Sequence, residues 1–238
     1  MLERWPRERL VVVPSEEFGP AALDVFREAL RGTEAPVIGL PTGRTPVPLY
    51  EQMTREGFSF ADQAQLFAVD EYCSREPHPG TNAAFFARYL PEQAYPAVRV
   101  PRYDAEHPES EIIQFCREIV AAGGLDLAVL GIGTNGHLAF NEPGSSALCP
   151  CRVVELAAST RAQVADAWEP APSHGMTVGM AELLSARRIV LFANGASKAA
   201  IVAAALDGPV TPDLPASLLQ PHAAVTVVCD VDAAALLR

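Results

Sequence analysis

Short apolar runs alternate along the chain with longer stretches in which apolar residues recur at helical spacing. The apolar runs predict buried strands over residues 10–13, 37–40, 66–69, 125–130, 152–156, 189–193 and 225–229. The stretches between them predict helices over residues 15–31, 46–55, 81–90, 108–122, 178–185 and 197–206. Strands that are apolar on both faces and alternate with helices are typical of a parallel sheet covered on both sides. We therefore expect an α/β fold built on a three-layer, mostly parallel, doubly wound, Rossmann-like sheet.

The amino-acid composition excludes several classes of protein. The 238 residues are 49% hydrophobic and 20% charged, which excludes a disordered chain, a collagen-like chain and a coiled coil. Because no linker, repeat or low-complexity tract interrupts it, the chain is predicted to form one domain over residues 1–238. Its 18 basic and 29 acidic residues give a formal net charge of −11, so neither nucleic acid nor a membrane surface is an expected partner. The apolar runs are also too short for a transmembrane helix.

Cysteine usage and the first residues favour a cytoplasmic protein. The five cysteines, at positions 73, 116, 149, 151 and 229, are odd in number and scattered, so we expect them to be reduced and structural. Cys149 and Cys151 lack the spacing and the second close pair of a zinc site, and no metal is expected. Residues 1–9 are highly charged and contain no apolar core of a signal peptide.

A candidate anion-binding turn follows the second predicted strand. In sheets of this type, ligands bind beyond the carboxyl ends of the strands. Residues 41–46 read Pro-Thr-Gly-Arg-Thr-Pro and lie between that strand and a predicted helix. Backbone N–H groups at such a turn, together with the two hydroxyl groups or Arg44, can bind an anion. The same residues also suit a plain tight turn, and both interpretations stay open.

Two adjacent carboxylates, Asp70 and Glu71, follow the strand that ends at Val69. Carboxylates at a strand end are commonly capping groups. A carboxyl group held in a partly desolvated cleft would instead have a raised pKa, which suits a group that moves a carbon-bound proton. The sequence leaves open which of these roles each carboxylate has.

A glycine-rich loop follows the strand that ends at residue 130. Its glycines, within residues 131–136, match the Gly-x-Gly-x-x-Gly pattern of dinucleotide-binding loops, and Glu155 lies near the distance expected of the acidic partner. That pattern requires a long helix from the third glycine, whereas Pro143-Gly144 interrupts the segment, so we expect no nicotinamide or flavin. The residues instead predict an active-site loop in which His137 and Glu142 supply acid–base chemistry.

Two basic residues follow later strands. Arg161 comes after the strand predicted at 152–156, and Lys198 lies at the start of the helix after the strand at 189–193. A lysine in the first helical turn opposes the helix dipole, so this placement suggests an anionic ligand. For each residue, a plain solvent-exposed cation is the alternative.

Six segments together resemble the glucosamine-6-phosphate deaminase (isomerase) family over nearly the whole chain. They are Gly39–Pro46, Val69–Tyr72, Gly136–Ser145, Met176–Gly179, Gly195–Ala199 and Pro215–Gln220. The related 6-phosphogluconolactonases share the glycine–histidine loop but lack the Phe-Asn-Glu-Pro continuation that is present here at residues 140–143. The resemblance implies the sugar-phosphate isomerase type of α/β fold.

The resemblance also implies a reaction, in which glucosamine 6-phosphate is deaminated by hydrolysis and isomerised from aldose to ketose, giving fructose 6-phosphate and ammonium. No cofactor is implied, because the sugar carbonyl is itself the electron sink. The implied catalytic residues are Asp70, Asn135, His137 and Glu142. The implied substrate-binding residues are Thr42, Gly43, Arg44, Thr45, Gly136, Arg161 and Lys198. The expected partner is a small sugar phosphate, bound by a monomer or a small homo-oligomer.

Two residues depart from the family pattern. Asn135 stands where the family has an aspartate, and an amide cannot ionise. Arg44 replaces a small residue of the phosphate loop. Two other functions therefore stay open. One is a 6-phosphogluconolactonase or another sugar-phosphate isomerase that keeps the His137 loop, and the other is a catalytically impaired sugar-phosphate binding protein.

Overall fold

The computed structural model describes residues 5–92, 94–162, 164–165 and 168–237. Its main sheet is parallel, and in the described residues it has seven strands. Their spatial order is β1 (Leu10–Val13), β10 (Val225–Asp230), β9 (Arg188–Ala193), β6 (Leu127–Gly131), β2 (Val37–Leu40), β3 (Gln65–Ala68) and β5 (Val98–Arg99). The predicted mostly parallel α/β sheet is therefore confirmed.

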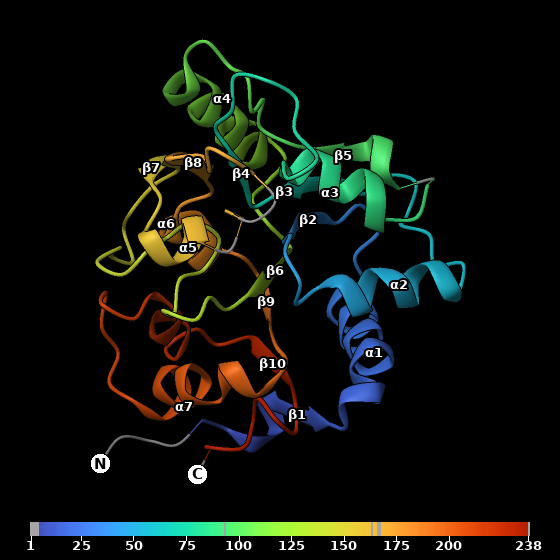
Figure 1. Cartoon of the computed structure of the whole chain (residues 1–238). Coiled ribbons are helices and arrows are strands. Elements are labelled where there is room, and N and C mark those ends of the chain that lie inside the picture. Colours follow the sequence, from blue (N-terminus) through green and yellow to red (C-terminus); the bar gives the residue numbers. More distant parts are fainter. Residues whose placement is uncertain (1–4, 93, 163, 166–167, 238) are drawn as a thin grey trace.

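Helices cover both faces of this sheet (Figure 1). The α-helices are α1 (Phe18–Leu30), α2 (Val47–Arg55), α3 (Asn82–Tyr89), α4 (Pro108–Ala121), α5 (Ala158–Ala162), α6 (Met180–Leu184) and α7 (Ala199–Asp207). Short 3-10 turns lie at η1 (Arg7–Arg9), η2 (Ser15–Glu17), η3 (Tyr95–Ala97), η4 (Ala196–Lys198) and η5 (Pro215–Leu219). Helices α1, α2 and α3 pack on one face of the sheet, while α4, α6 and α7 pack on the other.

Strand β9 shows why the sequence predicts burial on both faces. Successive side chains of a strand point to opposite faces of its sheet. Val190 and Phe192 therefore enter the apolar cluster beneath α1 and α2, while Leu191 enters the cluster beneath α6 and α7. All three side chains are buried, so the strand has no polar face and reads as one continuous apolar run.

A second, antiparallel sheet was not predicted. Strand β8 (His174–Thr177) pairs with β4 (Asp70–Tyr72) on one side and with β7 (Arg152–Glu155) on the other. The run at 152–156 does form a strand, but it belongs to this small sheet and not to the parallel one. The strands β4 and β8 are short and carry polar residues, so they produce no apolar run.

The cysteine prediction was wrong for one pair, because Cys116 of α4 and Cys151 form a disulfide. Both side chains are buried where α4 packs on the second sheet, and their Cα atoms lie 6.4 Å apart, within the span that a disulfide bridges. The two positions are 35 residues apart in the sequence, so spacing alone could not reveal the pair. Cys73, Cys149 and Cys229 are free thiols.

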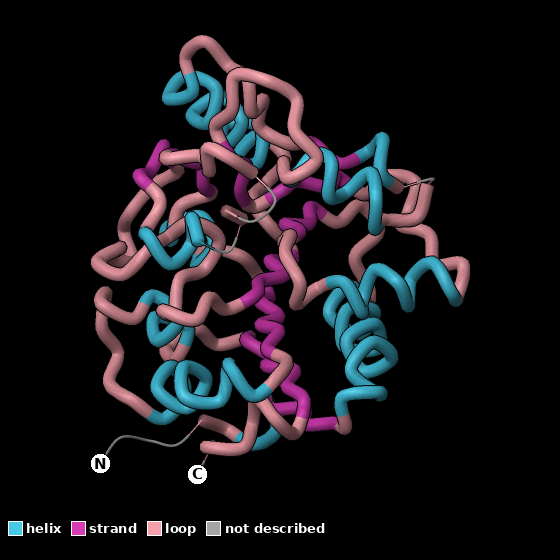
Figure 2. The backbone as a smooth tube through the Cα atoms, in the orientation of Figure 1, coloured by secondary structure: helices cyan, strands magenta, loops and turns pink. Residues whose placement is uncertain are grey.

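Between β2 and β6, the side of the sheet on which the next strands are added reverses. Strand β2 pairs with β3 on one side and with β6 on the other; β5 lies beyond β3, and β9, β10 and β1 lie beyond β6. Figure 2 shows the parallel strands as a central column with helices on both sides. Loops that leave β2 and β6 at their carboxyl ends diverge, and in open α/β sheets this divergence is where ligands bind.

Replacing Phe192 with alanine should destabilise the protein by about 3–5 kcal/mol, because a fully buried aromatic side chain would leave a cavity. Its ring packs edge-on against Phe18, at a centroid distance of 5.8 Å. Urea unfolding of Phe192→Ala measures the loss. Val12→Ala, at a side chain that is 43% exposed, is the control. A loss at Phe192 no larger than the one at Val12 would contradict the packing described here.

Candidate active site

A cavity of about 110 Å³ lies at the carboxyl ends of the central strands. Its lining comes from the segments that follow β2, β3, β6 and β9, together with Thr160 of α5. The lining residues are Pro41, Thr42, Gly43, Arg44, Thr45, Val69, Asp70, Tyr72, Gly131, Ile132, Gly133, His137, Ala139, Phe140, Thr160 and Lys198. The fold thus brings together seven of the residues singled out from the sequence: Thr42, Gly43, Arg44, Thr45, Asp70, His137 and Lys198.

The turn after β2 is held in place from two sides. The buried Tyr50 hydroxyl of α2 donates a hydrogen bond of 2.7 Å to the Pro41 carbonyl. The Asn194 amide, from the loop after β9, donates to the Thr45 carbonyl at 3.4 Å. Gly43 has a φ of 88°, a left-handed conformation that glycine adopts without strain. The turn is therefore anchored at both ends, with its hydroxyl groups and Arg44 at the cavity.

Lys198 reaches the same cavity from the end of η4. Its Nζ donates to the Ile132 carbonyl at 2.7 Å, and burial together with the Arg44 charge lowers the pKa of the amine. The preceding loop is fixed by Asp230 at the end of β10, whose two carboxylate oxygens accept from the Gly195 N–H at 3.0 and 2.9 Å. Two neighbouring cations in a chain of net charge −11 make this end of the cavity suited to an anion.

The sequence left open whether Asp70 and Glu71 are capping groups or line a cleft, and the structure places them differently. Glu71 is fully buried and accepts hydrogen bonds from the backbone N–H groups of Tyr72, Asn82 and Ala83, at 2.7–2.8 Å. It therefore caps the start of α3. Asp70 instead lines the cavity and accepts a bond from the Asn82 amide.

Both carboxyl groups have raised pKa values. Burial and the neighbouring Glu71 charge raise the pKa of Asp70 to about 8, against the opposing effect of the Asn82 hydrogen bond. Burial raises the pKa of Glu71 to about 7, although its three backbone donors favour the charged form. A buried carboxyl group with a pKa near neutrality, inside a cavity, suits general base catalysis.

His137 and Glu142 form a second acid–base pair. His137 Nδ1 lies 3.4 Å from Glu142 Oε2, and the same carboxylate accepts from the Asn135 amide at 2.8 Å and from the Thr160 hydroxyl at 2.5 Å. Burial opposes ionisation of Glu142, but these partners lower its pKa to about 2. Glu142 is therefore an anion at neutral pH that orients the imidazole, and His137 presents its ring to the cavity.

The glycines of this loop make room for the imidazole. A Cβ atom added to Gly133 would overlap the His137 ring. Gly136 has a φ of 85°, and a Cβ there would meet the Leu214 side chain. Packing within the loop thus accounts for the second and third glycines of the Gly-x-Gly-x-x-Gly spacing.

Some of the residues singled out from the sequence do not line the cavity. Asn135 and Glu142 act behind His137, and Gly136 shapes the turn. The Arg161 side chain is exposed on α5, outside the set of lining residues among those described.

Sequence reasoning missed several residues of the site. These are Tyr72, Phe140, Thr160 and Asn82. Three of them lie in or next to segments already singled out, because Tyr72 completes the Asp-Glu-Tyr triplet, Phe140 begins the Phe-Asn-Glu-Pro run and Thr160 precedes Arg161. Their contacts, such as the Tyr72 and Phe140 rings at 4.8 Å, join segments that are far apart in the sequence.

Residues 16–228 match the family described as glucosamine-6-phosphate isomerases/6-phosphogluconolactonase. The chain belongs to this family. A glucosamine-6-phosphate deaminase of Rhodopirellula baltica is 40% identical over 237 residues, which cover 95% of this chain and 94% of the relative. One from an Arthrobacter species is 37% identical and covers 96% of this chain and 92% of its own.

Solved structures of the family have the same fold. A monomeric glucosamine-6-phosphate deaminase superposes with a TM-score of 0.89 at 31% identity, over 96% of this chain and 99% of its own. A 6-phosphogluconolactonase of Trypanosoma brucei has a TM-score of 0.76 at 18% identity, over 99% of this chain and 100% of its own. At that identity the likeness to the lactonase extends to the fold alone.

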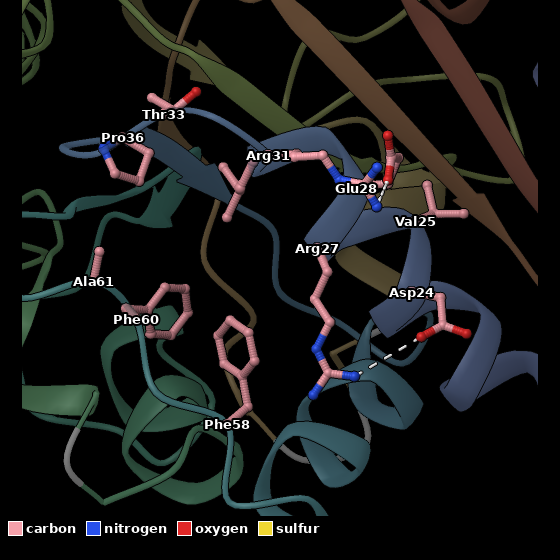
Figure 3. A pocket seen from close by; sticks show the side chains of 11 residues that line it. Asp24, Val25, Arg27, Glu28, Arg31, Thr33, Pro36, Phe58, Phe60 and Ala61 are labelled. Carbon is pink, nitrogen blue, oxygen red and sulfur yellow. Dashed lines mark ion pairs between the residues drawn. The ribbon is translucent and has the colours of Figure 1, made fainter.

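A larger hollow of about 720 Å³ lies near the C-terminal end of α1 (Figure 3). Phe58, Phe60 and Pro36 line it, and Pro36 directly precedes β2, so the hollow lies at the amino end of that strand. Its arginines already have partners, with Arg27 2.8 Å from Glu56 and Arg31 2.6 Å from Glu28. No histidine is among its described lining residues and its arginines are already paired, so we assign the family's chemistry to the smaller cavity.

Among the described residues, no three His, Cys, Asp or Glu side chains gather as a metal site would require. In the same part of the chain, no helix is long and apolar enough to cross a membrane.

Replacing Asp70 with asparagine should stabilise the fold, and more so at pH 8 than at pH 4. The folded state raises the pKa of Asp70 from 3.8 to about 8, so between these values it holds a proton that the unfolded chain has released. The free energy of unfolding therefore falls as the pH rises through this window, and Asp70→Asn removes that loss. Thermal unfolding should show a gain above about 1 kcal/mol at pH 8.

The same substitution at exposed Asp62 controls for the loss of one negative charge. An Asp70→Asn gain that is equal at both pH values would contradict the raised pKa.

Proposed function

We propose that this chain is a glucosamine-6-phosphate deaminase. It would convert glucosamine 6-phosphate and water to fructose 6-phosphate and ammonium. The observation that carries the proposal is one cavity that combines a buried carboxyl group of raised pKa, Asp70, with the His137–Glu142 pair and a cationic end at Lys198. The relatives named glucosamine-6-phosphate deaminase, at 33–40% identity, support the same substrate.

The substrate phosphate would bind at the cationic end. The turn at residues 42–45 offers backbone N–H groups and hydroxyls, and Lys198 and Arg44 add charge. Arg161 belongs to the proposed set through the resemblance, although its side chain is exposed in this structure. With the phosphate there, the sugar ring would extend toward Asp70 and His137.

Ring opening would be assisted by His137. The imidazole can move a proton between the C1 hydroxyl and the ring oxygen, which breaks the bond between C1 and that oxygen and yields the open aldehyde. The Glu142 anion, whose Oε2 lies 3.4 Å from His137 Nδ1, orients the ring.

Asp70 would then shuttle one proton. As a carboxylate it removes the hydrogen from C2, and the electron pair forms a C1–C2 double bond while the C1 oxygen takes a proton from the substrate's own ammonium group and becomes a hydroxyl. Return of the Asp70 proton to C1 leaves an iminium group at C2. Water adds to C2 and ammonia leaves with a proton as ammonium, so the ketose forms without any other reactant.

Asn135 supports this chemistry differently from the family's aspartate. Its amide donates to Glu142 Oε2 at 2.8 Å, a bond that helps to lower the Glu142 pKa. An ionised aspartate at this place would bring a second negative charge to the same oxygen. We propose that the amide keeps Glu142 charged, and that activity survives the substitution.

We further propose that residues 1–238 act as one domain, as a monomer and in the cytoplasm. The two apolar clusters lie on opposite faces of one sheet, and the structural relative of TM-score 0.89 is described as monomeric. The Cys116–Cys151 disulfide counts against the cytoplasm, because such a bond is unusual in a reducing compartment. Sedimentation at several concentrations and fractionation of cells that express the chain test these points.

Incubation with glucosamine 6-phosphate should release ammonium and fructose 6-phosphate in equal amounts. Asp70→Asn and His137→Ala should each lower kcat by about 10²–10⁴-fold while the fold survives, because each removes a general acid–base group. A parallel assay uses 6-phosphogluconolactone. Hydrolysis of the lactone without ammonium release would favour the lactonase, and tight binding of sugar phosphates without turnover would favour a binding protein.

Lys198→Ala and Arg161→Ala should weaken binding of phosphorylated ligands more than they lower kcat. A charge-assisted hydrogen bond to an anion is worth roughly 1.5–3 kcal/mol, so KM should rise at least about tenfold for a residue in contact. Inhibition by inorganic phosphate measures the same site without the sugar. Arg187→Ala, at an exposed arginine of the amino edge, is the control. Unchanged phosphate inhibition in both variants would refute the assigned anion site.

A further inference from the structure

Asn82, the first residue of α3, contacts both acidic residues that follow β3. Its side-chain Nδ2 donates to Asp70 Oδ1 at 2.5 Å and to the Asp70 carbonyl at 2.9 Å. Its backbone N–H donates to Glu71 Oε1 at 2.8 Å. The Asn82 side chain is 3% exposed, so both amide hydrogens serve Asp70 in a place that water hardly reaches.

Glu71 makes this contact rigid. Its two carboxylate oxygens accept from the backbone N–H groups of Tyr72, Asn82 and Ala83, which ties the first turn of α3 to β4. The Thr81 hydroxyl accepts from the Ala84 N–H at 3.2 Å and caps the same turn. The helix start therefore cannot shift without breaking several buried bonds, and the Asn82 amide is held against the cavity carboxylate.

We propose that Asn82 is a positioning residue for the proton transfer, an inference that rests on the proposed function. By binding Oδ1, its amide leaves Asp70 Oδ2 as the oxygen that takes the proton from C2. The same bond favours the carboxylate over the carboxylic acid, because an amide N–H donates more strongly to a charged oxygen. Asn82 is not among the residues that line the cavity in the described chain, so it acts through Asp70.

The groups around Asp70 shift its pKa in opposite directions. Burial and Glu71 raise the pKa of Asp70, and Asn82 lowers it. The titratable groups that face it are Glu71 and Tyr72 from β4, Tyr50 from α2, and Arg44, His137 and Lys198 across the cavity. The two tyrosine pKa values are raised by burial and by Asp70, so the phenols remain neutral donors. Asn82 is thus the uncharged partner through which the carboxylate can be tuned.

The test compares Asn82→Leu, a substitution of nearly equal size, with the wild type. Side-chain carboxyl NMR of the ligand-free protein follows Asp70, assigned from the signal that Asp70→Asn removes. The pKa of Asp70 should rise by about one unit, since one lost hydrogen bond of ordinary strength has that effect. Asn82→Ala, which adds no bulk, is the second variant and should shift the pKa in the same direction.

Kinetics supply the second readout. The acidic limb of the kcat/KM profile should move upward with the Asp70 pKa, and kcat at pH 7 should fall about tenfold with little change in KM. Thr81→Val weakens the same helix start without touching Asp70, and its profile should keep the wild-type position.

An unmoved Asp70 titration in both Asn82 variants overturns the proposal, as does an equal shift in Thr81→Val. A wild type that releases no ammonium from glucosamine 6-phosphate would count against the proposed function instead. The NMR titration then still decides whether Asn82 controls Asp70.

Discussion

Parallel pairing of β2 with β6 is the constraint on which the site depends. Ile38 lies opposite Leu127, so the two strands end side by side at one edge of the sheet. The chain leaves them toward opposite sides, and the loops at residues 41–46 and 131–137 diverge around a cavity. Adjacent strands add Asp70 after β3 and Lys198 after β9. Acid–base groups and cations that are up to 154 residues apart in the sequence, as Arg44 and Lys198 are, share the cavity for this reason.

The acid–base groups are tuned by their surroundings. Burial without a cationic partner raises the Asp70 pKa, whereas hydrogen bonds from three side chains lower that of Glu142. Two carboxyl groups that line or back the same cavity thus have pKa values of about 8 and about 2. This separation allows one of them to exchange a proton near neutral pH while the other stays charged and holds a histidine.

The sequence predicts those parts of the structure that depend on local pattern. Buried parallel strands such as β9 read as unbroken apolar runs, and residues past their ends, such as His137, could be singled out from position alone. The second sheet escaped prediction because β8, His-Gly-Met-Thr, has no apolar run and is stabilised by pairing with β4 and β7. The Cys116–Cys151 disulfide and the contact of Asn82 with Asp70 escaped because they form only when separate segments pack.

The central claim is that one carboxylate, held by Asn82 on one side of the substrate, moves the proton between C2 and C1. It is tested most directly with glucosamine 6-phosphate deuterated at C2 and converted in D₂O, so that every proton delivered to C1 is a deuteron. Proton NMR of the fructose 6-phosphate should show one deuterium, confined to a single prochiral position of C1. Deuterium spread equally over both C1 positions would contradict transfer by one fixed base.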